Sequence, residues 1–318
     1  IFVGINPFIS SNYQKIIFSR LIIVSNIPLL ISCFLQKNLG IYGPFSTLNG
    51  LIIWFQRAPG ETTISTTGLF NNPNYAGFSL SLTIPFLLYN IIENKNKRSR
   101  KIISIFILIL TIYYLFLTQS RNAYLSLILS FSLTFGIKVI LLILILLMIL
   151  YPLNLLIGIN IEFEYIFLSI KKNLLEHQRL EIWQNTLSLI KQRPLLGWGG
   201  ATFGALYVLN NGLYKSQHSH NMILQIAQSY GLPCSIIIST TIILLLIKSS
   251  TIVFDKKNQI DPINKYWVIS SIIISVHQLF DIVLYEGRLN IIFCIIFAGC
   301  KSILEKSNKN ENILNVVK

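Results

Sequence analysis

Charged residues are scarce in this chain. Only 12% of its 318 residues are Asp, Glu, Lys or Arg, whereas 53% are hydrophobic. A helix needs roughly 20 apolar residues to cross a hydrocarbon core of about 30 Å, and several runs here approach that length. The runs are unbroken rather than alternating, which favours helices, because every backbone polar group inside a bilayer must find a partner within the protein. The composition therefore excludes a soluble globular domain and predicts an all-α polytopic membrane protein, a helical bundle.

Cysteine pairs with a metal-binding or redox spacing are also missing. The four cysteines are far apart in apolar surroundings and form no C-x-x-C pair, which indicates buried thiols rather than a disulfide framework or a zinc site. The sequence shows no repeat, no low-complexity tract and no signal-peptide cleavage site. Residues Ile1–Phe8 are apolar but too short to span, so we expect them to be the end of a helix that starts in a preceding segment.

Eight apolar runs divide the chain into three parts. We expect membrane helices with short loops at 1–157, an extracytoplasmic loop containing amphipathic helices at 158–221, and membrane helices with a cytoplasmic tail at 222–318. The predicted spans are Leu21–Leu35, Tyr75–Ile92, Ile102–Leu117, Ala123–Phe135, Val139–Ile157, Met222–Ile247, Tyr266–Leu284 and Leu289–Ile303.

The basic residues predict the orientation of these spans. The chain carries 26 Lys and Arg against 12 Asp and Glu, a net charge of +14, and half of the cations lie in the links 93–101 and 248–265 and in the tail. Short basic loops mark the cytoplasmic face of a membrane protein. The polar segment 158–221 is then expected outside. The positive charge is thus interpreted as a topology signal rather than as a nucleic-acid-binding surface, so no nucleic-acid partner is expected.

Histidines gather at the end of the outer segment, in Gln217–Asn221. Histidine titrates near neutral pH and can take a proton from a hydroxyl group, so His218 and His220 are candidates for a base. The same spacing could bind a metal ion, but no acidic residue or third histidine stands nearby in the sequence, so we expect no metal. His277 and Asp281 are four residues apart in a predicted span, either as a self-satisfied hydrogen-bonded pair or as a proton relay.

Several arginines lie on the predicted outer face. Arg121 stands in a short turn between two spans, where it is either a snorkelling anchor or a clamp for phosphate oxygens, which a guanidinium binds bidentately. Arg179 lies four residues before Trp183, hence beside it on an amphipathic helix expected at about Leu174–Gln192 and stopped by Pro194. The further arginines of this face are Arg57, Arg193 and Arg288.

Asn74 is the expected N-cap of the second span. The free backbone N–H groups of that helix end are either simply capped or form a seat for an anion.

Five short segments together resemble the superfamily of membrane O-antigen ligases and O-antigen polymerases, which includes bacterial O-linked oligosaccharyltransferases. His220 and Asn221 also fit the ligase pattern of His, then Asn, Ser or Gln, nine residues, and Gly, here Gly231. Cys234 departs from the last position of that pattern, where Gly, Thr or Tyr is expected. The matching segments, in family order, are Gly68–Ala76 (GLFNNPNYA), Ser120-Arg121, Arg179-x-x-x-Trp183, Pro194–Gly199 (PLLGWG) and His218–Asn221 (HSHN).

The resemblance implies an inverting glycosyltransferase of the bacterial inner membrane, with its active site facing the periplasm and with neither metal nor cofactor. His220 would activate the acceptor hydroxyl, while Arg121 and Arg179 would hold the diphosphate of the donor. The implied partners are a polyprenyl-diphosphate-linked glycan, an acceptor on lipid A core, a glycan or a protein, and membrane lipids. A polymerase of the same superfamily is the alternative, and a transporter without catalysis a further one. The implied substrate-binding residues are Arg57, Asn74, Arg193, His218, Asn221 and Arg288.

Overall fold

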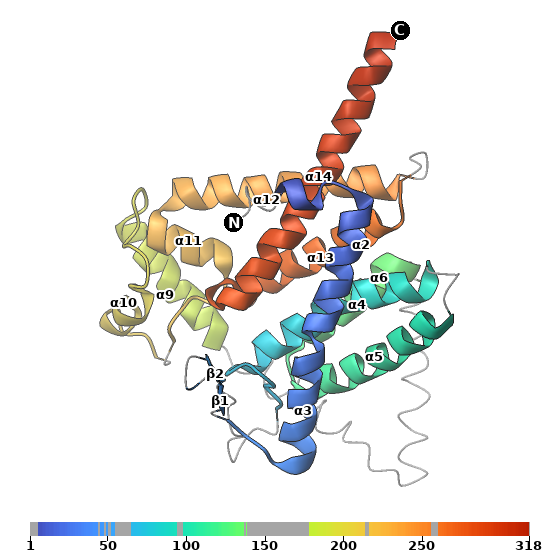
Figure 1. Ribbon diagram of the computed structural model, residues 1–318. Coiled ribbons are helices and arrows are strands. Elements are labelled where there is room, and N and C mark those ends of the chain that lie inside the picture. Colours follow the sequence, from blue (N-terminus) through green and yellow to red (C-terminus); the bar gives the residue numbers. More distant parts are fainter. Residues whose placement is uncertain are drawn as a thin grey trace. The chain divides into compact units, whose positions relative to one another are not determined.

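The computed structural model is mostly helical, and its chain forms two compact units that are interleaved along the sequence (Figure 1). Unit 1 comprises Ile1–Ser130, Ile242–His277 and Val283–Lys318, and unit 2 comprises Phe131–Thr241 and Gln278–Ile282. The residues that the structure describes are 6–43, 45–47, 49, 52–54, 65–93, 98–136, 138, 178–213, 216–255 and 260–317.

Unit 1 holds most of the long apolar helices. A two-stranded antiparallel hairpin, β1 and β2, pairs Phe45 with Trp54, so the expected all-helical fold carries one small sheet among the described residues. The elements of this unit are η1 (Asn6–Ile9), α2 (Asn12–Ser25), α3 (Ile27–Leu39), β1 (Phe45–Thr47), β2 (Ile52–Trp54), α4 (Pro73–Ile92), α5 (Arg98–Leu117), most of α6 (Arg121–Phe135), the second half of α12 (Leu232–Phe254), α13 (Ile263–Gln278), η2 (Val283–Tyr285) and α14 (Gly287–Val317).

Helix α4 is the central helix of unit 1, because its side chains are buried on all faces from Ala76 to Asn90. Its start corrects one expectation: the N-cap is Asn72, whose side-chain oxygen accepts the backbone N–H of Asn74 at 2.9 Å. Asn74 itself is the second residue of the helix, after Pro73. Proline is well suited to the first helical position because its missing N–H would have no partner there.

Five described helical segments are long and apolar enough to cross a membrane, judged by length and composition: Asn12–Leu39, Pro73–Ile92, Arg98–Leu117, Leu232–Phe254 and Gly287–Ser307. Each overlaps one of the predicted spans, although the bounds differ. Helix α6 is shorter than expected of a full span, with 15 residues. Helix α13 ends at Gln278 rather than reaching Leu284. The predicted span Val139–Ile157 lies outside the described residues.

Unit 2 contains the end of α6, then α9 (Gln178–Gln192), α10 (Phe203–Leu209), α11 (Met222–Tyr230) and the first half of α12. The predicted run Met222–Ile247 is therefore not one helix, because it breaks at Gly231, whose φ of 88° is left-handed. The apolar stripe of α9 packs as expected, with Ile182 and Trp183 against Phe203 and Tyr207 of α10.

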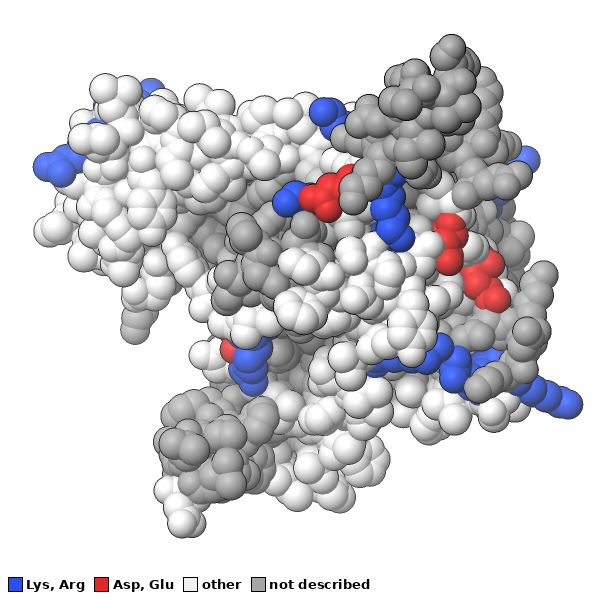
Figure 2. Space-filling view, turned by 45° about the horizontal axis from the view of Figure 1, so that its top comes forward, with Lys and Arg blue, Asp and Glu red and all other residues white. Residues whose placement is uncertain are grey.

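Charged side chains are sparse on the surface as well. On the face drawn in Figure 2, uncharged surface predominates and the Lys, Arg, Asp and Glu side chains form a few separate groups. Exposed large hydrophobic side chains are frequent on α5 and α12, for example Phe106 at 61% and Ile237 at 66%. A soluble monomer rarely exposes this much contiguous apolar surface, so the surface agrees with a multi-pass membrane protein.

Candidate functional site

The histidine loop lies at the start of α11 in unit 2. Asn221 is the N-cap of α11, and its side-chain oxygen accepts the backbone N–H of Leu224 at 3.1 Å. The amide nitrogen of the same side chain donates to the carbonyl oxygen of Leu279 at 3.0 Å. One asparagine thus fastens the loop both to α11 and to the short turn that follows α13, which explains its place directly after the histidines.

Helix α9 holds the other side of this loop. The indole nitrogen of Trp183 donates to the carbonyl oxygen of Ser219 at 2.9 Å, while the backbone N–H of Ser219 donates to Gln225 Oε1 of α11 at 2.8 Å. Ser219 is fully buried between these partners. Arg179, half-buried, lies one helical turn before Trp183 on α9. The Arg-x-x-x-Trp spacing therefore places an arginine on the helix that holds the histidine loop through Trp183.

His220 occupies an unusual backbone conformation. Its φ is 54°, a left-handed value that is uncommon for a residue with a side chain. The backbone N–H of His220 donates to Nδ1 of His218 at 3.3 Å, and the two rings meet edge to face with their centroids 4.2 Å apart. Strained backbone of this kind persists only where the surrounding structure enforces it. Here the enforcing contacts are His218 and the bonds of Ser219.

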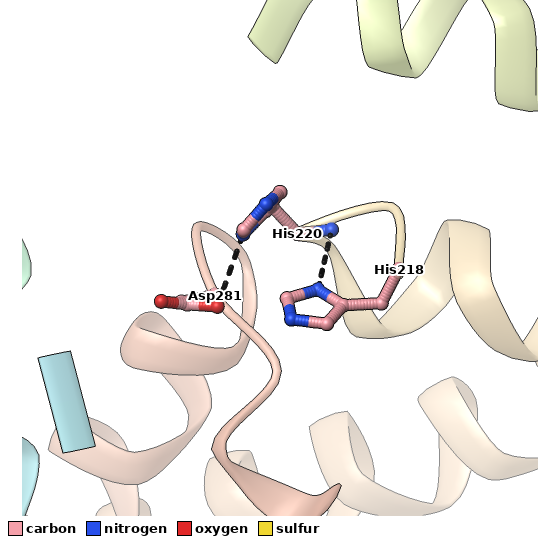
Figure 3. A group of neighbouring side chains, drawn as sticks. All are labelled: His218, His220 and Asp281. Carbon is pink, nitrogen blue, oxygen red and sulfur yellow. Dashed lines mark hydrogen bonds and ion pairs between the residues drawn. The ribbon is translucent and has the colours of Figure 1, made fainter. Parts of the chain in front are cut away.

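A buried carboxylate faces the imidazole of His220. Asp281 Oδ1 lies 3.2 Å from His220 Nδ1 and also accepts the backbone N–H of Ile282 at 2.8 Å (Figure 3). The side chain of Asp281 is 0% exposed, whereas that of His220 is 27% exposed. A carboxylate oxygen accepts, so a neutral His220 carries its proton on Nδ1 and presents Nε2 as the basic nitrogen.

This partner overturns the expected pairing of Asp281 with His277. Because α13 ends at Gln278, Asp281 lies beyond the helix and does not share a helical face with His277. His277 instead packs edge to face on Phe78, with the ring centroids 4.9 Å apart. Sequence spacing could not reveal the pair His220–Asp281, since 61 residues separate its members. The only hint was an acidic residue inside an apolar stretch, where ionisable side chains are rare.

His218 is a neutral member of the cluster. Its pKa is lowered to about 4, chiefly by burial and further by the neighbouring His220, while Asp281 partly opposes the shift. A neutral imidazole has one acceptor nitrogen, and in His218 that nitrogen is Nδ1, which takes the N–H of His220. His218 is thus suited to hold the backbone of its neighbour rather than to carry charge.

The cluster also has the composition of a metal site. One ligand atom each from His218, His220 and Asp281 lies within 4.8 Å of the others, so the expectation that no acidic ligand stands nearby is wrong. A metal-bound histidine normally donates its second ring N–H to an acceptor. Nδ1 of His218 instead accepts a hydrogen bond. The surrounding bonds therefore fit a proton-handling group better than a metal centre.

The segment Pro194–Gly199 packs on the junction of α11 and α12. The backbone N–H groups of Trp198 and Gly199 donate to the carbonyl oxygens of Gln228 and Ser229 at 2.9 and 2.8 Å. A Cβ at Gly231 would overlap the carbonyl oxygen of Leu195. The nine residues between Asn221 and Gly231 are those of α11 itself, so the ligase-like spacing is the length of this helix plus a junction that admits only glycine.

Arg193 covers this segment. Its guanidinium lies 4.2 Å from the ring centroid of Trp198, a cation–π contact, and the indole of Trp198 donates to the carbonyl oxygen of Leu189 at 2.8 Å. The side chain of Arg193 is exposed.

The remaining predicted residues lie in unit 1 or outside the described residues. Arg121, exposed, is the first residue of α6, and the turn before it packs closely on α4, because a Cβ at Gly77 would lie 3.1 Å from that of Ser120. Arg288 is paired with Glu286 at 2.6 Å and lies over the ring of Phe70 at 4.5 Å. Asn74 is in the first turn of α4. Arg57 lies outside the described residues.

The long apolar helices indicate a multi-pass membrane protein, and its histidine loop pairs a partly exposed imidazole with a buried carboxylate. Residues 106–239 match the family described as O-Antigen ligase. This match covers less than half of the chain and supports a relation to the O-antigen ligase superfamily, whose members are glycosyltransferase-like enzymes. A comparison with curated proteins gives no match. The matched segment contains four of the five resemblance motifs and both loop histidines, but not Asp281.

Proposed function

We propose that this protein transfers a glycan from a polyprenyl-diphosphate donor to an acceptor hydroxyl on the extracytoplasmic side of the bacterial inner membrane, as an O-antigen ligase does. The observation that carries the proposal is the pair formed by the partly exposed His220 and the fully buried Asp281, 3.2 Å apart. An oriented base whose second nitrogen is accessible is the arrangement that activates a hydroxyl nucleophile. The family match supports the reaction class.

In the proposed reaction, Nε2 of His220 takes the proton of the acceptor hydroxyl as its oxygen attacks the anomeric carbon. The bond between that carbon and the diphosphate oxygen breaks, and polyprenyl diphosphate leaves with the electron pair, so the sugar is inverted. Asp281 accepts the Nδ1–H of His220 throughout, which fixes the tautomer and stabilises the imidazolium. No metal or cofactor is assigned to these steps.

Arg179 is the proposed binding group for the diphosphate. It is carried by the helix that fixes the histidine loop through Trp183. A guanidinium binds phosphate oxygens bidentately and stabilises charge that develops on the leaving group. Arg121, Arg57, Arg193 and Arg288 remain candidates for contacts to the donor, as do Asn74, His218 and Asn221 for either substrate.

Replacement of His220 by asparagine tests the proposal. Asparagine tolerates the left-handed backbone of position 220, so His220→Asn removes the imidazole without the strain that alanine would introduce. We expect the rate of glycan transfer by purified protein to fall by about 10²–10⁴, the usual contribution of a general base. The thermal unfolding midpoint should stay near that of the parent. Undiminished transfer by a folded His220→Asn protein would contradict the proposal.

A polymerase of the same superfamily is the second candidate. Cys234 stands where the ligase pattern has Gly, Thr or Tyr, and this departure favours a relative outside the ligases proper. Electrophoresis of glycolipids from a deletion strain separates the two. Loss of all long glycan-bearing bands indicates a ligase, and accumulation of a single repeat unit indicates a polymerase. The band that changes also identifies the acceptor, which is lipid A core, a glycan or a protein.

A further inference from the structure

The turn that follows α9 presents two leucines outward. Leu195 is 70% exposed and Leu196 is 87% exposed. Both belong to the segment that is bonded to the α11–α12 junction, where the backbone N–H of Leu232 donates to the carbonyl oxygen of Pro194 at 2.7 Å. The close approach of Leu195 to Gly231 fixes the turn further. These contacts thus hold both leucines in an exposed position. Exposing their apolar side chains to water is unfavourable in free energy, and an apolar environment would remove this penalty.

These leucines stand beside the first residue of a candidate membrane span. Helix α12 begins at Leu232, and only 6% of its most apolar window is buried within the protein. The early turns of α12 continue the exposed apolar surface, with Ile236 at 62% and Ile237 at 66%. The end of a span lies at the boundary between lipid and water. A turn bonded to that end therefore lies at the same boundary.

The residues around the turn have the composition of a membrane interface. Lys191 and Arg193, both exposed, precede the leucines. Trp198 follows them, and Tyr230, which is 56% exposed, precedes Gly231. Tryptophan and tyrosine concentrate at the headgroup level of membranes, and cations are attracted to anionic lipid headgroups. An apolar tip between cations and aromatic rings indicates a lipid surface rather than a protein partner.

We propose that residues 194–198 form a membrane anchor of the outer loop, in which Leu195 and Leu196 insert into the headgroup–acyl boundary of a bilayer containing anionic phospholipid. Lys191 and Arg193 then lie among the headgroups, and Trp198 and Tyr230 lie at the interface. The anchor holds α9 and the histidine loop at the membrane surface, because Trp198 of the same segment donates to the carbonyl oxygens of Leu189 in α9 and Gln228 in α11. Helix α11 begins directly after the histidine loop. This inference does not depend on the proposed reaction.

Depth measurement by spin labelling tests the anchor on the full chain. A nitroxide is attached to Leu196→Cys in a background whose native cysteines are replaced by serine, and the protein is reconstituted into liposomes that contain anionic phospholipid. Collisions with oxygen, which concentrates in lipid, are compared with collisions with a water-soluble nickel complex. We expect oxygen to be favoured several-fold at position 196. Ser188→Cys, on the exposed surface of α9, is the control and should favour the nickel complex.

The outcomes are decisive in both directions. Equal accessibility to the nickel complex at positions 196 and 188 would overturn the anchor. Leu195→Cys provides a second label should the first variant fold poorly, and it should report the same boundary. Because neither label touches the histidine loop and the readout is depth rather than turnover, failure of the anchor leaves the proposed reaction untouched. Failure of the reaction likewise leaves the measured depth intact.

Discussion

The two units divide the resemblance motifs between them and use different chemistry to hold them. In unit 1 the segment Gly68–Ala76 is fixed by neutral groups: the side-chain oxygen of Gln36 accepts the backbone N–H groups of Thr67 and Gly68 at 2.9 and 3.0 Å. In unit 2 the histidine loop is fixed by an indole, a glutamine and a buried carboxylate. In unit 1 the contacts that fix the motif are thus neutral, whereas in unit 2 they include the ionisable pair His220–Asp281.

This difference suggests separate tasks for the two units. Arg121 and Arg288 of unit 1 offer permanent positive charge, which binds phosphate but moves no proton. In unit 2 the imidazole of His220, held by the carboxylate of Asp281, is the group proposed to take a proton from the acceptor. Substitutions of His220 and Asp281 should therefore affect the rate of the chemical step, and those of Arg121 and Arg288 the affinity for an anionic donor.

Asp281→Asn should give the largest loss. The amide cannot hold the Nδ1–H tautomer of His220 or stabilise its imidazolium, so we expect the turnover rate to fall by about 10³–10⁴, as in hydrolases that lose the corresponding carboxylate. Donor affinity should change little. Transfer assays that separate kcat from KM provide the measurement. Asp255→Asn removes a carboxylate just beyond α12, outside the cluster, and should retain activity.

Gly231→Ala should destabilise unit 2 strongly. The new Cβ would overlap the carbonyl oxygen of Leu195 and would sit on a left-handed backbone, which together cost about 2–5 kcal/mol. Gly136 has the same φ of 88° but no atom within 4 Å of its Cβ position, so Gly136→Ala carries only the backbone cost of about 1–2 kcal/mol. Thermal unfolding of both variants in one detergent gives the comparison. Equal midpoints would show that the packing at Gly231 matters little.

Lysine substitutions of Arg121 and Arg179 test whether each arginine contributes to donor binding alone or also to the chemical step. Lysine keeps the charge but loses the bidentate geometry, so KM for the donor should rise about tenfold, the equivalent of about 1.4 kcal/mol. For Arg121→Lys we expect kcat to stay near the parent value, whereas Arg179→Lys should lower it as well, since the leaving diphosphate is its proposed partner. A Lys variant of either site with parental kinetics would remove that arginine from the diphosphate site.

His218 should produce the smallest effect, visible in the pH dependence of stability. Its pKa is lowered from 6.5 to about 4 in the folded protein, so the unfolded chain binds a proton first as the pH falls. The contribution of His218 is present above pH 6.5 and is lost progressively between 6.5 and about 4. His218→Asn, whose side-chain oxygen can still accept the N–H of His220, should flatten this acid slope. An unchanged slope in unfolding scans at pH 7.5 and 5 would refute the assignment.

Sequence patterns predicted the helical class, most of the long spans and the end of α9, because apolar runs and a proline are local features. They placed His220, Arg179 and Trp183 in one predicted loop, 158–221, because the three residues lie between the same two apolar runs. They missed Asp281 as the partner of His220, since that contact joins distant segments and depends on α13 ending at Gln278. They also misplaced the cap of α4 by two residues, because Asn71, Asn72 and Asn74 are equally good caps in isolation.

The loop between α13 and η2 supplies the carboxylate of the pair, although the recognisable family segment ends at residue 239. An excised fragment bounded by that segment would keep both imidazoles and lose the acid that orients one of them. Attempts to build a minimal catalyst, or to exchange this segment with that of a relative, must therefore carry along the turn at 279–282, or the transplanted base will point in an arbitrary direction.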